Sequence, residues 1–182
     1  AGKEPMLKNR SIDSSPFIDD DGKGYLFFVY LERGNHVYMA ELTDDFLSIK
    51  PETMRHLLSV SQTWEKDSLF PYAIVNEGPC VIKDKGTYYL TYSANDYRSK
   101  NYGIGYATSK DIRGPWIKSQ DNPILQHAFG RNGTGHHTIF MDKKGRKRVA
   151  YHAHCSESEV HPRKTYFTTM KLKHGQLYMK GK

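Results

Sequence analysis

The stretch GPCVIKDKGTYYLTYS, residues 78–93, decides the fold. It begins with an apolar run, turns at Gly86 and continues with aromatic and β-branched residues, which is the pattern of a β-hairpin. Two other stretches repeat this pattern: SPFIDDDGKGYLFFVY (15–30), with Gly22 in the turn, and HTIFMDKKGRKRVAYHAH (137–154), with Gly145. The chain therefore carries three copies of one hairpin unit.

Two more strands follow each hairpin. The third strands are expected at 35–42, 101–109 and 164–172, and the fourth near 56–60, 115–119 and 176–180. Four consecutive antiparallel strands per repeat are typical of a propeller blade. We therefore predict an all-β chain, a partial β-propeller of three four-stranded antiparallel blades in one domain spanning 1–182. The blade-like repeats cover approximately 13–60, 77–119 and 136–180, and closed propellers need about four to eight blades.

The composition agrees with this fold and narrows the partners. The 13 tyrosines and 8 phenylalanines favour strands. The formal net charge of +7 is scattered or lies in hairpin tips such as 142–148, which favours solvated lysines over nucleic-acid binding. No stretch has the apolar length of a membrane span, so we expect neither nucleic acid nor membrane as a partner. Cys80 and Cys155 lie in apolar segments, where free thiols pack as small hydrophobes.

One polar residue stands just before the first strand of every repeat: Asp13, Glu77 and His136. Because they occupy the same phase of the repeat, we expect them to meet at one central site. Two facing carboxylates suit acid–base chemistry, since repulsion and desolvation raise the pKa of one, and glycoside hydrolysis uses such a pair. Taken singly, the three also fit a turn aspartate, a surface glutamate and a hydrogen-bonded core histidine.

Other site chemistries find less support in the sequence. His136, His137, His152, His154 and Cys155 lack the ligand spacing of a zinc site. No GxSxG elbow or phosphate-binding glycine loop is present in the printed sequence. The sequence therefore favours carboxylate chemistry.

Several ordered motifs resemble glycoside hydrolase family 43, five-bladed propeller enzymes that act on arabinose- and xylose-containing polysaccharides. The resemblance covers almost the whole chain and differs from the family at Ser14, where proline is more usual, and at Lys164, where an acid is more usual. The motifs that carry it are SIDSSPFIDDDGKGYLFF (11–28), NEGPCVIKDKGTYYLTYSAND (76–96), YGIGYATSKDIRGPWIKSQDNPIL (102–125), GTGHH (133–137) and PRKTYF (162–167).

The resemblance implies a role for each matching residue. Glu77 is expected to be the general acid, Asp13 the carboxylate that raises the pKa of that acid, and Arg163 a contact to the sugar that is cleaved. His136 is expected on the propeller axis, holding calcium or a water network. The family inverts the anomeric centre, with a general-base aspartate whose carboxyl group lies about 6.5–9.5 Å from that of the acid.

That base belongs to a blade absent from the sequence, so we expect the three blades to be inactive alone. Their exposed edges and faces are expected to favour self-association. The expected substrate is a plant-type pentose polysaccharide or oligosaccharide, which favours a secreted or periplasmic location. The alternatives are a non-catalytic carbohydrate-binding propeller and a scaffold for protein partners.

Four other residues are candidate sugar contacts. Trp64 and Phe70 offer ring faces for stacking, although both also fit the seam between two blades, where aromatic side chains are usually buried. Asn95 and Tyr97 follow the second hairpin and are weaker candidates. The sequence leaves open whether the sugar is an arabinoside or a xyloside, and whether cleavage is internal or terminal.

Overall fold

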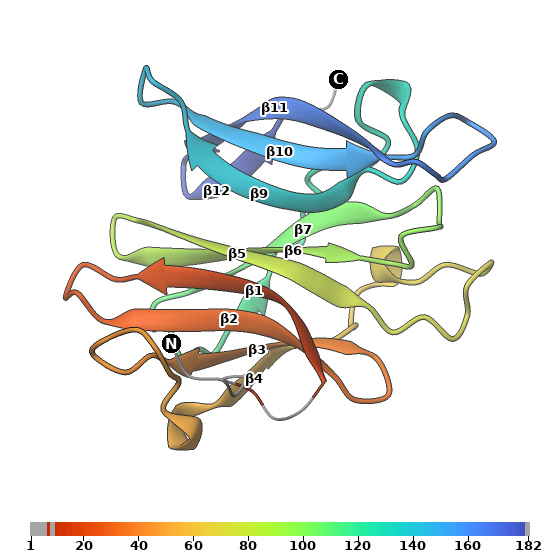
Figure 1. Cartoon of the computed structure of the whole chain (residues 1–182). Helices are drawn as coiled ribbons and strands as arrows, with labels where there is room; N and C mark the ends of the chain where they lie inside the picture. Colours follow the sequence, from red (N-terminus) through yellow and green to blue (C-terminus); the bar gives the residue numbers. More distant parts are fainter. Residues whose placement is uncertain (1–6, 8–9, 181–182) are drawn as a thin grey trace.

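The computed structural model describes residue 7 and residues 10–180 as three antiparallel sheets of four strands each (Figure 1). Neighbouring strands follow chain order in every sheet. The predicted all-β fold built from propeller blades is therefore confirmed. The strands are β1 (Ser11–Ile18), β2 (Gly24–Leu31), β3 (Asn35–Glu41) and β4 (Arg55–Leu58); β5 (Asn76–Asp84), β6 (Thr87–Ala94), β7 (Gly103–Ser109) and β8 (Ile117–Lys118); β9 (Gly135–Met141), β10 (Lys147–Ala153), β11 (Lys164–Lys173) and β12 (Gln176–Met179).

Only short helical turns interrupt the strands within the described part of the chain. They are η1 (Pro51–Thr53), η2 (Thr63–Glu65) and η3 (Ala128–Gly130), all of the 3-10 type. Among residue 7 and residues 10–180, no helix has the length and apolar character that a membrane crossing requires. The connections therefore act mainly as loops that carry side chains between blades.

The middle sheet packs against a neighbour on each face, and β6 shows why. Leu90 and Tyr92 join the apolar cluster that contains Phe27 of the first sheet. Tyr89, whose side chain points to the other face, joins the cluster that contains Tyr151 of the third sheet. A strand buried on both faces needs apolar side chains in both directions, which explains the aromatic run TYYLTY. The blades are thus stacked face to face around two apolar interfaces.

The first strand of each sheet has irregular pairing near its beginning. The register shifts between Ile12 and Ser15 in β1, between Glu77 and Cys80 in β5, and where β10 pairs with β9. Such bulges bend a strand and redirect side chains. The three irregularities fall where the sequence places its candidate site residues.

The backbone conformation at these irregularities is also unusual. Asp13, Gly78 and His136 have φ values of 57°, 56° and 47°. Positive φ is uncommon outside glycine, and aspartate and histidine are among the side chains that tolerate it. The backbone is therefore bent at the same position in all three first strands.

Strand direction places these bends on one face of the molecule. The first and third strands of a sheet run in the same direction, so both begin at the same end of the sheet (Figure 1). The hairpin turns at residues 18–24, 84–87 and 141–147 lie at the opposite end. Self-association stays a prediction, and exposed apolar side chains of the outer sheets, Ile18, Phe140 and Phe167, are candidates for such a contact.

Candidate active site

Glu77, at the start of β5, is held by residues from two sheets. Its side chain is 12% exposed. Oε2 accepts a hydrogen bond of 2.7 Å from Asn35 Nδ2, and Oε1 accepts one of 2.6 Å from the Tyr102 hydroxyl. Asn35 begins β3 and Tyr102 directly precedes β7. Because each oxygen has a donor, the carboxylate has a fixed orientation.

Asp13 reaches the same centre from β1. Its side chain is 15% exposed, and its Oδ2 accepts a hydrogen bond of 3.0 Å from the backbone N–H of Gly78. The backbone next to Glu77 is therefore bonded directly to the second carboxylate. The structure thus brings together the two acidic residues that the repeat phase singled out.

His136 lies between the two carboxylates. Its Nε2 is 3.7 Å from Asp13 Oδ1, and its Nδ1 is 3.7 Å from Glu77 Oε1. The backbone N–H of His136 donates a hydrogen bond of 2.8 Å to Ser93 Oγ, which fixes the start of β9 against β6. The three residues expected to meet therefore do so, each from a different sheet.

A stack of rings extends from this centre. The His136 and His152 ring centres are 6.1 Å apart with planes 14° apart, and the His152 and Tyr102 ring centres are 5.4 Å apart with planes 6° apart. Burial, with the charges of Arg163 and His136, lowers the pKa of His152 to about 3. His152 is therefore a neutral ring beside the charged groups.

The pKa values of the two carboxyl groups shift in opposite directions. Burial raises the pKa of Asp13, repulsion by Glu77 adds to this, and attraction by His136 opposes it. Burial also raises the pKa of Glu77, but hydrogen bonding with His136, Tyr102 and Asn35 outweighs burial, so the net direction is down. This net direction is opposite to the expectation that the Glu77 pKa is raised, because its hydrogen-bond donors favour the ionised form.

His136 shifts in the complementary direction. Its interaction with Glu77 raises the pKa of the imidazole, and the charge of Asp13 adds to this, against the effect of burial. The resting arrangement thus favours an ionised Glu77 beside a protonated His136.

Asp13, His136 and His152 line a hollow of about 450 Å³, and Glu77 lies directly beside it, next to the lining residue Gly78. Residues from all three first strands, β1, β5 and β9, form part of its wall. A small polar ligand of the size of a sugar unit fits a hollow of this size. The lining residues are Asp13, Ser14, Ser15, Gly78, Pro79, Cys80, His136, His137, Thr138, Ala150, Tyr151, His152 and Thr165.

Arg163, directly before β11, lies next to His152, one of the residues that line this hollow. It is exposed, its Nη1 is 3.4 Å from His152 Nδ1, and its guanidinium carbon is 4.7 Å from the centre of the Tyr97 ring. The structure therefore places the predicted arginine where it can contact a ligand.

Asn95 and Trp64 do not face the hollow. Asn95 stays a prediction as a sugar contact: in this structure its side chain is buried, and Nδ2 donates to the carbonyls of Trp64 and Asn101 at 2.8 and 2.9 Å. The Trp64 ring packs 6.0 Å from Tyr92, and its Nε1 donates to Gln62 Oε1 at 2.7 Å. Trp64 thus occupies the seam, the alternative that the sequence left open. Phe70 lies in a separate groove described below.

Three residues of the site were missed at the level of sequence: Asn35, Tyr102 and His152. Asn35 and Tyr102 share a signal with Arg163, since each stands at or just before the start of a third strand. First and third strands begin on the same face, so a search at both phases of the repeat would have found them. His152 lies within β10 and carries no such signal.

The metal expectations find no ligand set in the described residues. Within residue 7 and residues 10–180, no group of three histidine, cysteine or acidic side chains is arranged to hold a metal ion. Calcium takes six to eight oxygen ligands, whereas His136 presents nitrogen. His137 is buried with Nε2 2.7 Å from Thr91 Oγ1, and Cys80 and Cys155 are free thiols. Calcium near His136 stays a prediction.

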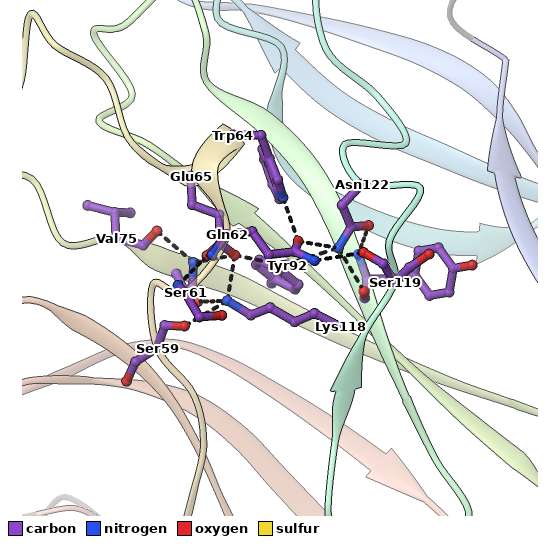
Figure 2. Close-up of polar contacts among 12 residues, drawn as sticks. Ser59, Ser61, Gln62, Trp64, Glu65, Val75, Tyr92, Lys118, Ser119 and Asn122 are labelled. Carbon is purple, nitrogen blue, oxygen red and sulfur yellow. Dashed lines mark hydrogen bonds and ion pairs between the residues drawn. The ribbon is translucent and has the colours of Figure 1, made fainter.

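A buried polar cluster supports the strand that carries Glu77 (Figure 2). Glu65 is fully buried and its Oε1 is 2.5 Å from Lys118 Nζ. Lys118 Nζ also donates to Asn76 Oδ1 at 2.9 Å, and Asn76 Nδ2 donates to Glu65 Oε1 at 3.3 Å. Because Asn76 directly precedes Glu77, this cluster fixes the backbone from which the site carboxylate projects.

Fold and site together define a β-propeller protein with an acidic pocket at the starts of its inner strands. The family model described as glycosyl hydrolases family 43 matches residues 2–177. The chain belongs to this family.

Individual relatives agree with this assignment. An endo-1,4-beta-xylanase structure from Bacteroides thetaiotaomicron is 42% identical with a TM-score of 0.92, over 100% of this chain and 62% of that one. A thermostable family-43 glycoside hydrolase structure is 33% identical with a TM-score of 0.89, over 98% and 61%. A beta-D-galactofuranosidase of Aspergillus niger is 30% identical over 156 residues, which are 82% of this chain and 40% of that protein. The chain thus spans less than two thirds of each relative.

Proposed function

We propose that this chain provides the acid side of an inverting glycoside hydrolase that acts on arabinose- or xylose-containing polysaccharides or oligosaccharides. The observation that carries the proposal is the meeting of Glu77 and Asp13 on either side of His136, 3.7 Å from each, with a hydrogen bond of 3.0 Å from Gly78 N–H to Asp13. Family membership and the similarity to an endo-1,4-beta-xylanase support a pentose-containing substrate.

Glu77 is the proposed general acid and gives its proton to the oxygen of the departing sugar. This role needs a protonated carboxyl group, whereas the resting site lowers the Glu77 pKa. A sugar that fills the hollow excludes water, and desolvation raises the pKa of a carboxyl group. An ionised Asp13 adds repulsion in the same direction. When substrate binds and the Glu77 pKa rises, the carboxylate takes up a proton from the solvent, and this is the proton that it gives to the departing sugar.

The general base is proposed to come from outside the three described blades. Inversion requires a second carboxylate that activates water on the opposite face of the sugar. Among the described residues, the carboxylates beside His136 are Asp13 and Glu77, and Asp13 is bonded to the backbone at Gly78. We therefore assign Asp13 to tuning the acid, and we expect this chain alone to bind sugar without hydrolysing it.

A non-catalytic carbohydrate-binding propeller is the second candidate. The ionised resting state of Glu77 favours it, because a carboxylate with a lowered pKa serves as a hydrogen-bond acceptor for sugar hydroxyl groups. Both candidates predict sugar binding at the same hollow. They differ in whether turnover appears when a base is supplied by a longer chain.

The test measures binding and product configuration together. Xylo- and arabino-oligosaccharides are titrated into the chain by calorimetry, and proton NMR follows the anomeric configuration of any product. We expect binding without product, with binding weakened in Glu77→Gln and unchanged in the control Glu41→Gln, a glutamate held by Lys50 and Arg113 at the far end of β3. Inverted product from the chain alone would show that the base lies within it. Absence of sugar binding would contradict both candidates.

A further inference from the structure

A row of rings and guanidinium groups leads away from the candidate active site. It starts at the stacked rings of His136 and His152 and continues through Arg163, whose guanidinium carbon is 4.7 Å from the Tyr97 ring centre. The Arg98 guanidinium carbon is 6.0 Å from the same ring centre and 5.1 Å from that of Phe70. Planar groups therefore follow one another without a break from His136 to Phe70.

The row ends in a second groove of about 330 Å³. Two of its apolar side chains are largely open to solvent, Tyr72 at 95% and Leu69 at 79%. An exposed tyrosine ring is a stacking surface with a polar tip. The lining residues are Leu69, Phe70, Pro71, Tyr72, Ala73, Asp96 and Arg98.

The charge of this groove is balanced. Arg98 donates from Nε to Asp96 Oδ1 at 2.8 Å and from Nη2 to Asp96 Oδ2 at 2.7 Å. This two-bond contact neutralises the guanidinium and leaves its flat face over Phe70. A charged ligand therefore meets no unpaired charge at Arg98 and Asp96, whereas a neutral ligand with apolar faces and hydroxyl edges matches the lining.

The loop that forms the groove is hydrogen-bonded to Asn35, a residue of the candidate active site. The carbonyl of Ile74 accepts a hydrogen bond of 2.7 Å from the backbone N–H of Asn35, and Asn35 and Val75 form a parallel bridge. Asn35 is the residue whose side chain binds Glu77. The loop at 66–75 and the candidate site therefore share the anchor Asn35, and this loop lies on the same side of the molecule as the starts of β1 and β5 (Figure 1).

We propose that the row and the groove form one extended surface for a linear, neutral oligosaccharide. One sugar unit occupies the hollow lined by Asp13 and His136, beside Glu77, and the units beyond it lie along Tyr97, Phe70 and Tyr72. This inference rests on the proposed function and narrows its substrate class to a chain with several consecutive sugar units. Affinity then increases with chain length until the groove is filled.

The experiment compares chain lengths on the intact chain. Xylobiose to xylohexaose and the matching arabino-oligosaccharides are titrated into the unmodified protein and Tyr72→Ala. Tyr178→Ala is the control, since Tyr178 is an exposed tyrosine (48%) on β12 of another sheet. We expect the hexasaccharide to bind about tenfold more tightly than the disaccharide, which corresponds to about 1.4 kcal/mol. Tyr72→Ala should remove most of this difference and leave disaccharide affinity unchanged.

The outcomes separate this inference from the proposed function. Equal affinity at all lengths, unaffected by Tyr72→Ala, would overturn the extended surface while leaving sugar binding at Glu77 intact. If binding is lost in Tyr72→Ala and unchanged in Glu77→Gln, the groove binds the sugar and the proposed binding site at Glu77 is wrong. If sugars of every length fail to bind, both ideas are wrong, and the exposed apolar groove is then better explained as a protein contact.

Discussion

Glu65 and Glu77 are two carboxylates with little exposure to solvent, and different partners stabilise their negative charges. Glu65 is fully buried and bonded to Lys118, Tyr92 and the backbone N–H groups of Ser61 and Gln62 (Figure 2). Glu77 has the neutral donors Asn35 and Tyr102. Its ionic neighbour, His136, is itself titratable near neutral pH.

The two glutamates therefore suit different roles, Glu65 a structural one and Glu77 a chemical one. Lys118 keeps a paired charge next to Glu65, although burial lowers the pKa of this lysine. The proton balance at Glu77 instead depends on His136, whose ring is 40% exposed to the hollow. A carboxylate whose partner can lose its proton is suited to proton transfer, whereas one bonded to a buried lysine is suited to holding a strand in place.

The largest expected effect comes from breaking the Glu65–Lys118 pair. Lys118→Met leaves Glu65 buried with an unpaired charge, and we expect a loss of about 3–5 kcal/mol in the free energy of unfolding, measured with urea. The double variant Glu65→Gln/Lys118→Met should recover most of this loss. Lys23→Met is the control, because its pair with Asp21 is exposed and contributes about 0–1 kcal/mol. Equal effects of the two lysine variants would contradict the assigned role of the buried pair.

A smaller effect is expected from Tyr102→Phe at Glu77. The variant removes the hydroxyl that donates to Glu77 Oε1, so stability should fall by about 1–3 kcal/mol and the Glu77 pKa should rise. Tyr151→Phe is a matched control, since the buried hydroxyl of Tyr151 has no hydrogen-bond partner in the described structure. Carbon-detected NMR of the glutamate carboxyl groups measures the pKa. An unchanged Glu77 pKa would show that Tyr102 does not stabilise the ionised form.

The smallest effect is expected from His136→Asn, and it depends on pH. Asparagine tolerates the positive φ at this position. The Glu77–His136 attraction needs Glu77 ionised, above its ordinary pKa of 4.5, and His136 protonated, below its ordinary pKa of 6.5. The stability difference between the two proteins should therefore be greatest between these values, at under about 1 kcal/mol for so exposed a ring.

The two pKa shifts set the pH range over which the unmodified protein is more stable than His136→Asn. The difference should disappear as pH rises through the raised His136 pKa, and also as pH falls through the lowered Glu77 pKa. Urea unfolding at a series of pH values measures it. A difference that is constant across this range would mean that the two side chains are not coupled.

The repeat made the first strands and their polar residues predictable. Asp13, Glu77 and His136 all stand at the starts of first strands, and these strands begin on one face, so their meeting was predictable. The register of the sheets makes Gly78 the equivalent of Asp13 and His136, so Glu77 lies one residue earlier in its strand. Asn35 and Tyr102 were missed because only one of the two strands that begin on this face was searched. The direction of the Glu77 pKa depended on those missed donors, and sequence spacing alone does not give hydrogen-bond geometry.

Loop residues were predicted less well, for a physical reason. Asn95 stands after a strand like a binding residue, yet its φ of 76° and its two bonds to carbonyl oxygens show that it shapes the loop. Polar side chains in loops serve backbone and ligand equally well. Trp64 has the same ambiguity, and only packing against Tyr92 resolves it.

The hairpin turns at the far end of the blades offer a practical use. A methyl group added at Gly86 or Gly145 would meet no neighbour within 4 Å, and both turns lie opposite the candidate site (Figure 1). A fluorescent dye or a tether to a solid support can therefore be attached beside either turn. The protein would then be immobilised with its pocket facing the solution.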